Sequence, residues 1–302
     1  AMQLPVSIQL KNTPPWLDSA ILGDILQTTV DLARRDDATF QRFQNPLDTG
    51  ILDEIPAQYA AHLNDHANAW LKRIDRIQRV ADRQHQQQCI EIYAEYRKPV
   101  AWVAVPFLPS GERVATPQAL GDLAQCRDHQ AQRRYYLVDA DLVRLPGEYS
   151  EADRRAMSGL MAIYGVDENV PLPGVAWGAP ELVAGLKLID TLKGQPYLNQ
   201  ISAINVSNYG ARIRPDVPQI TLETCWLTTD QLPHLVYWGR PVGENSFYEV
   251  STAAKLKALQ SLFVHYNRID AGRDYVDIRT EQIRVPRLAA QGDNPATSPA
   301  HS

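Results

Sequence analysis

Two pairs of residues have types and spacings that could support chemistry. His62 and His66 stand four residues apart on a predicted helix, the spacing of two zinc ligands on one helical face, but no glutamate lies between them and no third ligand is evident. Asp139 and Asp141 stand two residues apart at the end of a predicted strand, where they could hold a cation or act as acid and base. The plainer interpretations, two surface histidines and an aspartate turn, are favoured.

Other polar segments and the absence of catalytic motifs also favour structural roles over chemistry. Asp274, Asp277 and Arg279 alternate along a predicted strand, although aspartate is depleted in strands, so this segment is either an exposed edge or a buried ion pair. The sequon at residues 205–207 is interpreted as a polar turn. The sequence contains no GxSxG, GxxxxGK[ST], GxGxxG or HExxH motif. We therefore expect a protein that is not an enzyme and that uses no cofactor, metal or small-molecule substrate.

Composition and charge narrow the class of protein further. The chain has 302 residues, 44% hydrophobic and 22% charged, which is typical of a folded protein with room for two domains. Its formal net charge of −5 argues against a nucleic-acid partner. The longest apolar run, residues 99–109, is too short to cross a bilayer. Three widely spaced cysteines predict neither a disulfide framework nor a zinc site: Cys89, Cys126 and Cys225.

The periodicity of the first hundred residues predicts a small domain of order β-α-α-β-β. Residues 34–43 are polar and charged and lead into a loop, and Asp53 is the expected N-cap of the second helix. The apolar face of that helix is Ile55, Tyr59, Leu63, Ala67 and Trp70. The expected elements are a strand at residues 6–10, a helix after Pro14-Pro15, a helix ending near Trp70, and strands at 74–80 and 89–96.

The stretch CIEIYAEYRKPVAWVAV, residues 89–105, marks the boundary between two domains. Pro99 cannot donate to a strand ladder, so the first strand is expected to end, bend or change sheets there. Tyr96 and Trp102 fall on the inward side of alternating strands and are predicted to be structural. The residues expected on the buried face of the first strand are Ile90, Ile92, Ala94 and Tyr96.

The remaining sequence predicts a mixed α/β domain with a mainly antiparallel sheet. A helix begins at Pro180, and another is capped by Ser251 or Thr252. Residues 107–134 carry prolines and glycines without a sustained period and are expected to form an insertion, and residues 289–302 a disordered tail. Strands are expected near residues 135–138, 201–206, 219–227, 235–238, 275–279 and 282–285.

Five colinear segments resemble the FtsQ/DivIB family of bacterial cell-division proteins. They are WLKRIDRI (70–77), EIYAEYRKPVAWV (91–103), YYLVDAD (135–141), VYWG (236–239) and YVDIRTEQIRV (275–285). The resemblance implies a POTRA-like domain over residues 3–104 and a β-domain over 105–288. It also implies a non-enzymatic divisome scaffold whose β-domain binds single-span division proteins of the FtsB/DivIC and FtsL type, while its POTRA domain assists recruitment.

The resemblance further implies a place in the cell. Family members have one N-terminal transmembrane helix, which holds the ectodomain on the outer side of the bacterial cytoplasmic membrane at the division septum. Ala1-Met2 is interpreted as a cloning remnant, and we expect the membrane anchor to precede it.

The candidate binding site is the last predicted strand. A polar strand at a sheet edge has free backbone donors and acceptors, so a partner could bind by strand addition. Ile283 and Val285 would then fill alternate pockets. The partner-binding residues are predicted to be Arg279, Thr280, Glu281, Gln282, Ile283, Arg284 and Val285.

Two other functions are compatible with the same patterns. A POTRA-containing chaperone or translocation module would bind secreted or outer-membrane chains by the same edge pairing. An enzyme would need a site assembled around Asp139 and Asp274, which the absence of catalytic motifs disfavours.

Limited proteolysis tests the predicted division of the chain. The first cuts are expected in residues 107–134 or in the tail, because exposed loops and termini are cleaved before packed cores. A first cut within residues 201–238 would contradict the boundary near residue 104, and mass spectrometry of the early fragments distinguishes the two outcomes.

Overall fold

A computed structural model gives the structure of most of the chain. Residues 108–131 of the predicted insertion and the predicted tail fall outside the described residues, as do Leu63, Ala67 and the pair His62 and His66. The ends of the predicted insertion, residue 107 and residues 132–134, lie in strands, so its predicted bounds are too wide. The described residues are 6–34, 36–45, 47–61, 68–82, 87–107, 132–157, 159–167, 169–229, 231–244 and 246–286.

The described part is a mixed α+β fold with two mixed, largely antiparallel sheets, in agreement with the predicted class. It forms two compact units. The first unit takes its residues from 6–107, 132–160 and 167–183, and the second from 161–166 and 184–286. The boundary predicted between residues 104 and 105 stays a prediction.

A three-stranded sheet organises the first part of the chain, in the order β1-β3-β2. Strand β3 (Gln87–Tyr96) lies in the centre, parallel to β1 (Val6–Lys11) and antiparallel to β2 (Leu71–Asp82). Ile90 and Ile92 of β3 are buried while Glu91 between them is half-exposed. The predicted alternation of β3 is therefore confirmed from Ile90 to Ala94, whereas Tyr96, predicted on the buried face, is half-exposed.

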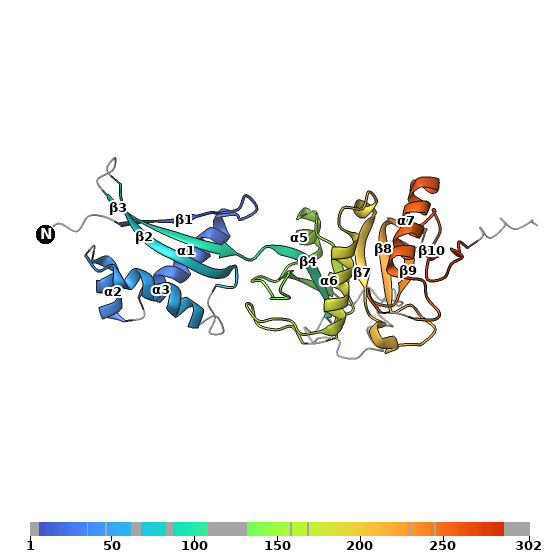
Figure 1. The fold of residues 1–302 in the computed structure, drawn as a ribbon, viewed down its shortest axis with the longest axis horizontal. Helices are drawn as coiled ribbons and strands as arrows, with labels where there is room; N and C mark the ends of the chain where they lie inside the picture. The colour runs from blue at the N-terminus through green and yellow to red at the C-terminus, as the bar shows by residue number, and fades with distance from the viewer. Residues whose placement is uncertain are drawn as a thin grey trace, which may run out of the picture. The chain divides into compact units, whose positions relative to one another are not determined.

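Three helices follow β1, where the sequence predicted two. They are α1 (Ser19–Ala33), α2 (Asp37–Gln44) and α3 (Gly50–Ala61), and α2 and α3 lie on the same side of the sheet (Figure 1). The expected order β-α-α-β-β is thus incomplete by one helix. The expected helix end near Trp70 is also wrong, because Trp70 lies in a turn before β2 in which the Asn68 side chain accepts its N–H.

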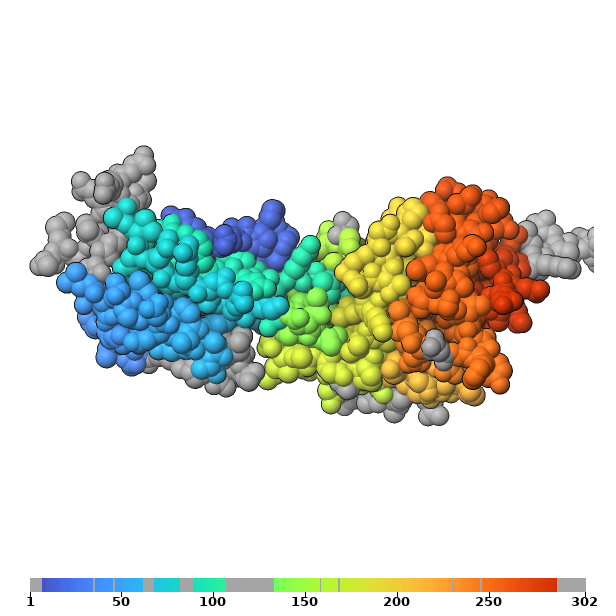
Figure 2. Space-filling view, viewed as in Figure 1, coloured from blue at the N-terminus to red at the C-terminus, as the bar shows by residue number. Residues whose placement is uncertain are grey.

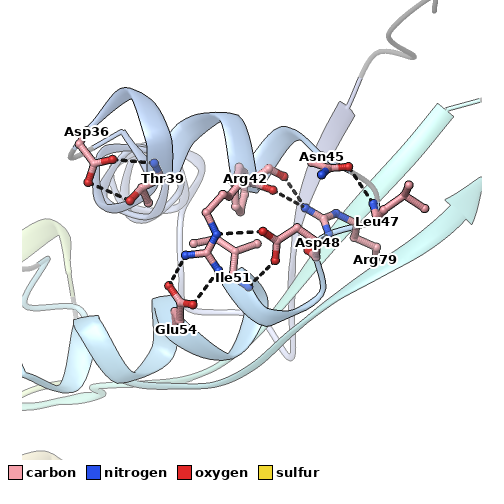
Figure 3. A network of polar contacts seen from close by, with 10 residues as sticks. Asp36, Thr39, Arg42, Asn45, Leu47, Asp48, Ile51, Glu54 and Arg79 are labelled. Atoms are coloured by element: carbon pink, nitrogen blue, oxygen red, sulfur yellow. Dashed lines mark hydrogen bonds and ion pairs between the residues drawn. The ribbon is translucent and has the colours of Figure 1, made fainter.

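Helix α2 is held by polar contacts rather than by an apolar stripe. The Asp36 carboxylate caps it by accepting the Thr39 N–H at 2.6 Å. Arg42 forms a bidentate pair with Glu54 at 2.7 and 2.8 Å and a bond to Asp48 at 2.8 Å, which joins α2 to α3 (Figure 3). Arg79 of β2 donates to backbone carbonyls at the end of the same helix. Because only Phe43 of α2 is buried, the sequence carries almost no periodic signal for it.

The Lys98-Pro99 junction ends β3 as predicted. Strand β4 (Pro99–Phe107) begins at the proline and belongs to a different sheet from β3, so the chain does change sheets there. It pairs in antiparallel fashion with β5 (Gln132–Asp139), which places Trp102 opposite Leu137. Trp102 is completely buried.

The second sheet has seven strands in the order β10-β9-β8-β7-β6-β4-β5. Strand β8 (Ile220–Leu227) is antiparallel to β7 (Ile201–Asn205) and to β9 (Pro233–Gly239). Strand β10 (Tyr275–Asp277) is parallel to β9, and the connection between them contains α7 (Thr252–Tyr266), as a parallel pair requires. Ser251 caps α7, as predicted.

Two short elements of this region were not predicted. Helix α5 (Glu151–Ala156) starts at a Ser150 capping box, and β6 (Ala162–Tyr164) pairs in parallel with β7. Neither is long enough to show a hydrophobic period. The predicted helix at Pro180 is confirmed as α6 (Pro180–Leu192).

Candidate partner-binding edge

The predicted binding segment folds as a short hairpin at the edge of the seven-stranded sheet. Strand β10 ends at Asp277, and the chain reverses before Arg284 returns beside it. The Asp277 N–H donates to the Arg284 carbonyl and the Arg284 N–H to the Asp277 carbonyl, each at 2.9 Å. The regular strand predicted at residues 282–285 is therefore wrong: the pairing is a single bridge. We call β10 together with residues 278–286 the C-terminal edge.

An ion pair within the C-terminal edge fixes its turn. Asp277 Oδ1 accepts from the backbone N–H of Arg279 at 3.0 Å and from its Nε at 2.9 Å, and Oδ2 accepts from Nη2 at 2.8 Å. Burial raises the pKa of the Asp277 carboxyl, but the hydrogen bonds from Arg279 outweigh it and hold the pKa below its ordinary value. Both interpretations of this segment thus apply: it is an edge, and it contains a buried pair. Arg279 is a structural residue of the turn.

The C-terminal edge rests on residues that lie far from it in the sequence. Tyr275 stacks on Tyr237 of β9 with ring centroids 5.0 Å apart, and the Arg279 guanidinium lies 5.9 Å from the Tyr237 ring. The Val250 N–H donates to the Arg279 carbonyl at 2.8 Å. Together with α7, the C-terminal edge forms part of the surface visible in Figure 2, in orange to red. These neighbours have no signal in the sequence because only the folded chain brings them together.

The hairpin determines which backbone groups point outward from the sheet. Since Asp277 and Arg284 exchange both hydrogen bonds, the alternation of an antiparallel pair turns the N–H and C=O groups of Ile283 and Val285 away from β10. Both side chains are half-exposed. Gln282 lies in the turn, where its carbonyl accepts from the Thr280 hydroxyl at 2.9 Å. Of the seven predicted residues, Ile283 and Val285 therefore offer the outward strand groups, while Glu281 and Arg284 contribute exposed charges.

The aspartates considered for chemistry have structural contacts. Asp139 Oδ1 accepts the N–H groups of Asp141 at 2.9 Å and Val143 at 2.8 Å, and Oδ2 accepts from Arg97 at 2.7 Å. The prediction of an aspartate turn is confirmed. The sequon is likewise a polar turn, in which Asn205 accepts the Ser207 N–H at 3.0 Å.

The described part of the chain also bears on metal binding and on membrane crossing. Within it, no group of three or more histidine, cysteine, aspartate or glutamate side chains is arranged to hold a metal ion. None of the helices described there is long and apolar enough to cross a membrane. The chain matches no protein-family model and no curated protein.

Proposed function

We propose that this chain is the extracytoplasmic part of a non-enzymatic scaffold similar to FtsQ/DivIB proteins. In this proposal it binds single-span division proteins of the FtsB/DivIC and FtsL type at the division septum, and an N-terminal helix anchors it in the cytoplasmic membrane. The colinear sequence segments support the family. The three-stranded sheet β1-β3-β2, together with its three helices, is compatible with a POTRA-like domain.

The observation that carries the binding proposal is the outward backbone of the C-terminal edge. A partner strand that pairs with Ile283 and Val285 would extend the sheet by one strand and would obtain its affinity from main-chain hydrogen bonds. The Asp277–Arg279 pair holds the turn before binding, so little conformational entropy is lost on association. Alternate side chains of the partner would then decide specificity.

Variants of the outward residues test this proposal. Val285→Pro removes one outward N–H donor, and since an amide hydrogen bond contributes about 0.5–1.5 kcal/mol net, the affinity should fall about 2- to 10-fold. Ile283→Lys places a charge in an apolar contact and should weaken binding by roughly 10-fold or more. Binding is measured by calorimetry with the extracytoplasmic segments of the FtsB/DivIC-type and FtsL-type proteins of the same organism.

Gln282→Lys is the matched control, because it adds the same charge at an exposed turn position without touching the outward groups. All three variants should melt close to the parent chain. Normal binding by both Val285→Pro and Ile283→Lys would place the interface elsewhere. If the parent chain binds unfolded outer-membrane polypeptides but neither division protein, the chaperone or translocation function replaces the scaffold function.

A further inference from the structure

Two adjacent aromatic side chains stand in solvent beside the C-terminal edge. Phe247 is fully exposed and Tyr248 is 86% exposed, in the connection between β9 and α7. Single exposed apolar residues are ordinary on protein surfaces, but neighbouring exposed aromatics on one loop form a larger apolar feature. Aromatic side chains are also enriched among the residues that dominate binding energy.

The residue that follows this aromatic pair, Glu249, is held in place by two contacts. Glu249 accepts the Arg240 N–H at 2.9 Å and the ammonium group of the buried Lys255 at 2.7 Å. The Tyr248 N–H donates to the Ser246 hydroxyl at 3.1 Å. The exposure of the rings is therefore a property of an anchored loop, and a ligand would not have to order this backbone.

The same loop is joined to the turn of the C-terminal edge. The Val250 N–H donates to the carbonyl of Arg279, the residue that opens the turn leading to Ile283. The aromatic pair thus stands only two and three residues before a residue that is bonded to the turn end of the hairpin. Residues 283–285 lead away from the turn, so a strand that pairs with them in antiparallel fashion, the commoner arrangement, leads toward it.

We propose that Phe247 and Tyr248 bind the segment that follows the added strand in the partner chain. This inference rests on the proposed function and identifies the second half of its interface. The bound segment is apolar, because two aromatic rings gain most by removing apolar surface from water. The partner therefore has two parts in order: a strand that pairs with Ile283 and Val285, and an apolar residue or short apolar turn on its C-terminal side.

The double substitution Phe247→Ser and Tyr248→Ser tests the inference in the full chain. The probe is the extracytoplasmic segment of the FtsB/DivIC-type protein of the same organism, together with a series of C-terminal truncations of it. The double variant should bind the full probe roughly 10-fold more weakly or worse, as expected for interface anchors. A truncation that still binds the parent chain should bind the double variant equally well.

Tyr266→Ser is the matched control, since Tyr266 is an exposed aromatic residue at the end of α7. It should leave the affinity unchanged, and both variants should melt close to the parent chain because each of the three side chains is more than half exposed. Unchanged affinity of the double variant for the full probe would overturn the inference, as would an equal loss with every truncation. Failure of the parent chain to bind any probe would instead refute the proposed function.

Discussion

Trp102→Ala should destabilise the protein by about 3–5 kcal/mol, the usual cost of truncating a fully buried tryptophan. Trp102 is completely buried in β4, and its ring makes edge contacts with Tyr135 at 6.4 Å and Tyr149 at 5.2 Å between centroids. Removing the indole leaves a cavity that its two aromatic neighbours, Tyr135 and Tyr149, cannot easily fill. Denaturant unfolding measures the loss as a lower midpoint.

Trp102→Phe and Tyr96→Ala are the controls for this prediction. The Trp102 Nε1 atom is buried without a hydrogen-bond partner among the described residues, so Trp102→Phe removes an unsatisfied donor and should cost less than Trp102→Ala. Tyr96 is half-exposed and donates to the Lys11 carbonyl at 3.1 Å, so Tyr96→Ala should cost less than the loss of a fully buried ring. An unchanged midpoint for Trp102→Ala would show that the residue is not part of the core. Loss of partner binding without loss of stability would make it a contact residue.

Asp139→Ala should also destabilise the protein by about 3–5 kcal/mol, because it removes the closer, buried carboxylate from the buried Arg97 guanidinium and leaves it the exposed Asp141 carboxylate at 3.5 Å. The side chains of Arg97 and Asp139 are only 12% and 5% exposed, and their atoms approach to 2.7 Å. The substitution also removes the acceptor of the Asp141 and Val143 N–H groups. The free energy of unfolding, measured in urea, should therefore fall by a large fraction of the total.

Two milder substitutions separate the loss of the Asp139 charge from the loss of its backbone hydrogen bonds and from the loss of an exposed ion pair nearby. Asp139→Asn keeps an oxygen for the two backbone donors and loses only the charge. Its free energy of unfolding should therefore lie between that of the parent chain and that of Asp139→Ala. Lys72→Ala breaks the neighbouring pair between Lys72 and Asp141, whose side chains are 41% and 52% exposed, and should cost about 0–1 kcal/mol. Equal effects of Asp139→Ala and Lys72→Ala would contradict a special role for the buried pair.

Features that depend on neighbours in the chain could be predicted from the sequence. The alternation of β3 follows from residues two apart, and the end of β3 follows from one proline at position 99. The cap of α7 is a contact between residues three positions apart, because the Ser251 hydroxyl accepts the Ala254 N–H. The turn at Asp139 likewise uses a side chain and backbone groups two and four residues away.

The tertiary structure decided the features that depend on distant residues. Helix α2 has one buried residue and depends on polar contacts with Glu54 of α3 and with Arg79, which is more than thirty positions away. Strand β6 is three residues long and exists because β7 lies beside it. The composition of the C-terminal edge predicted its position at the edge of a sheet. The backbone hydrogen bonds between Asp277 and Arg284, which form a hairpin in place of the predicted strand, depend on the folded chain. Local patterns determine dihedral preferences and burial, whereas sheet pairing and remote ion pairs depend on which surfaces the folded chain brings together.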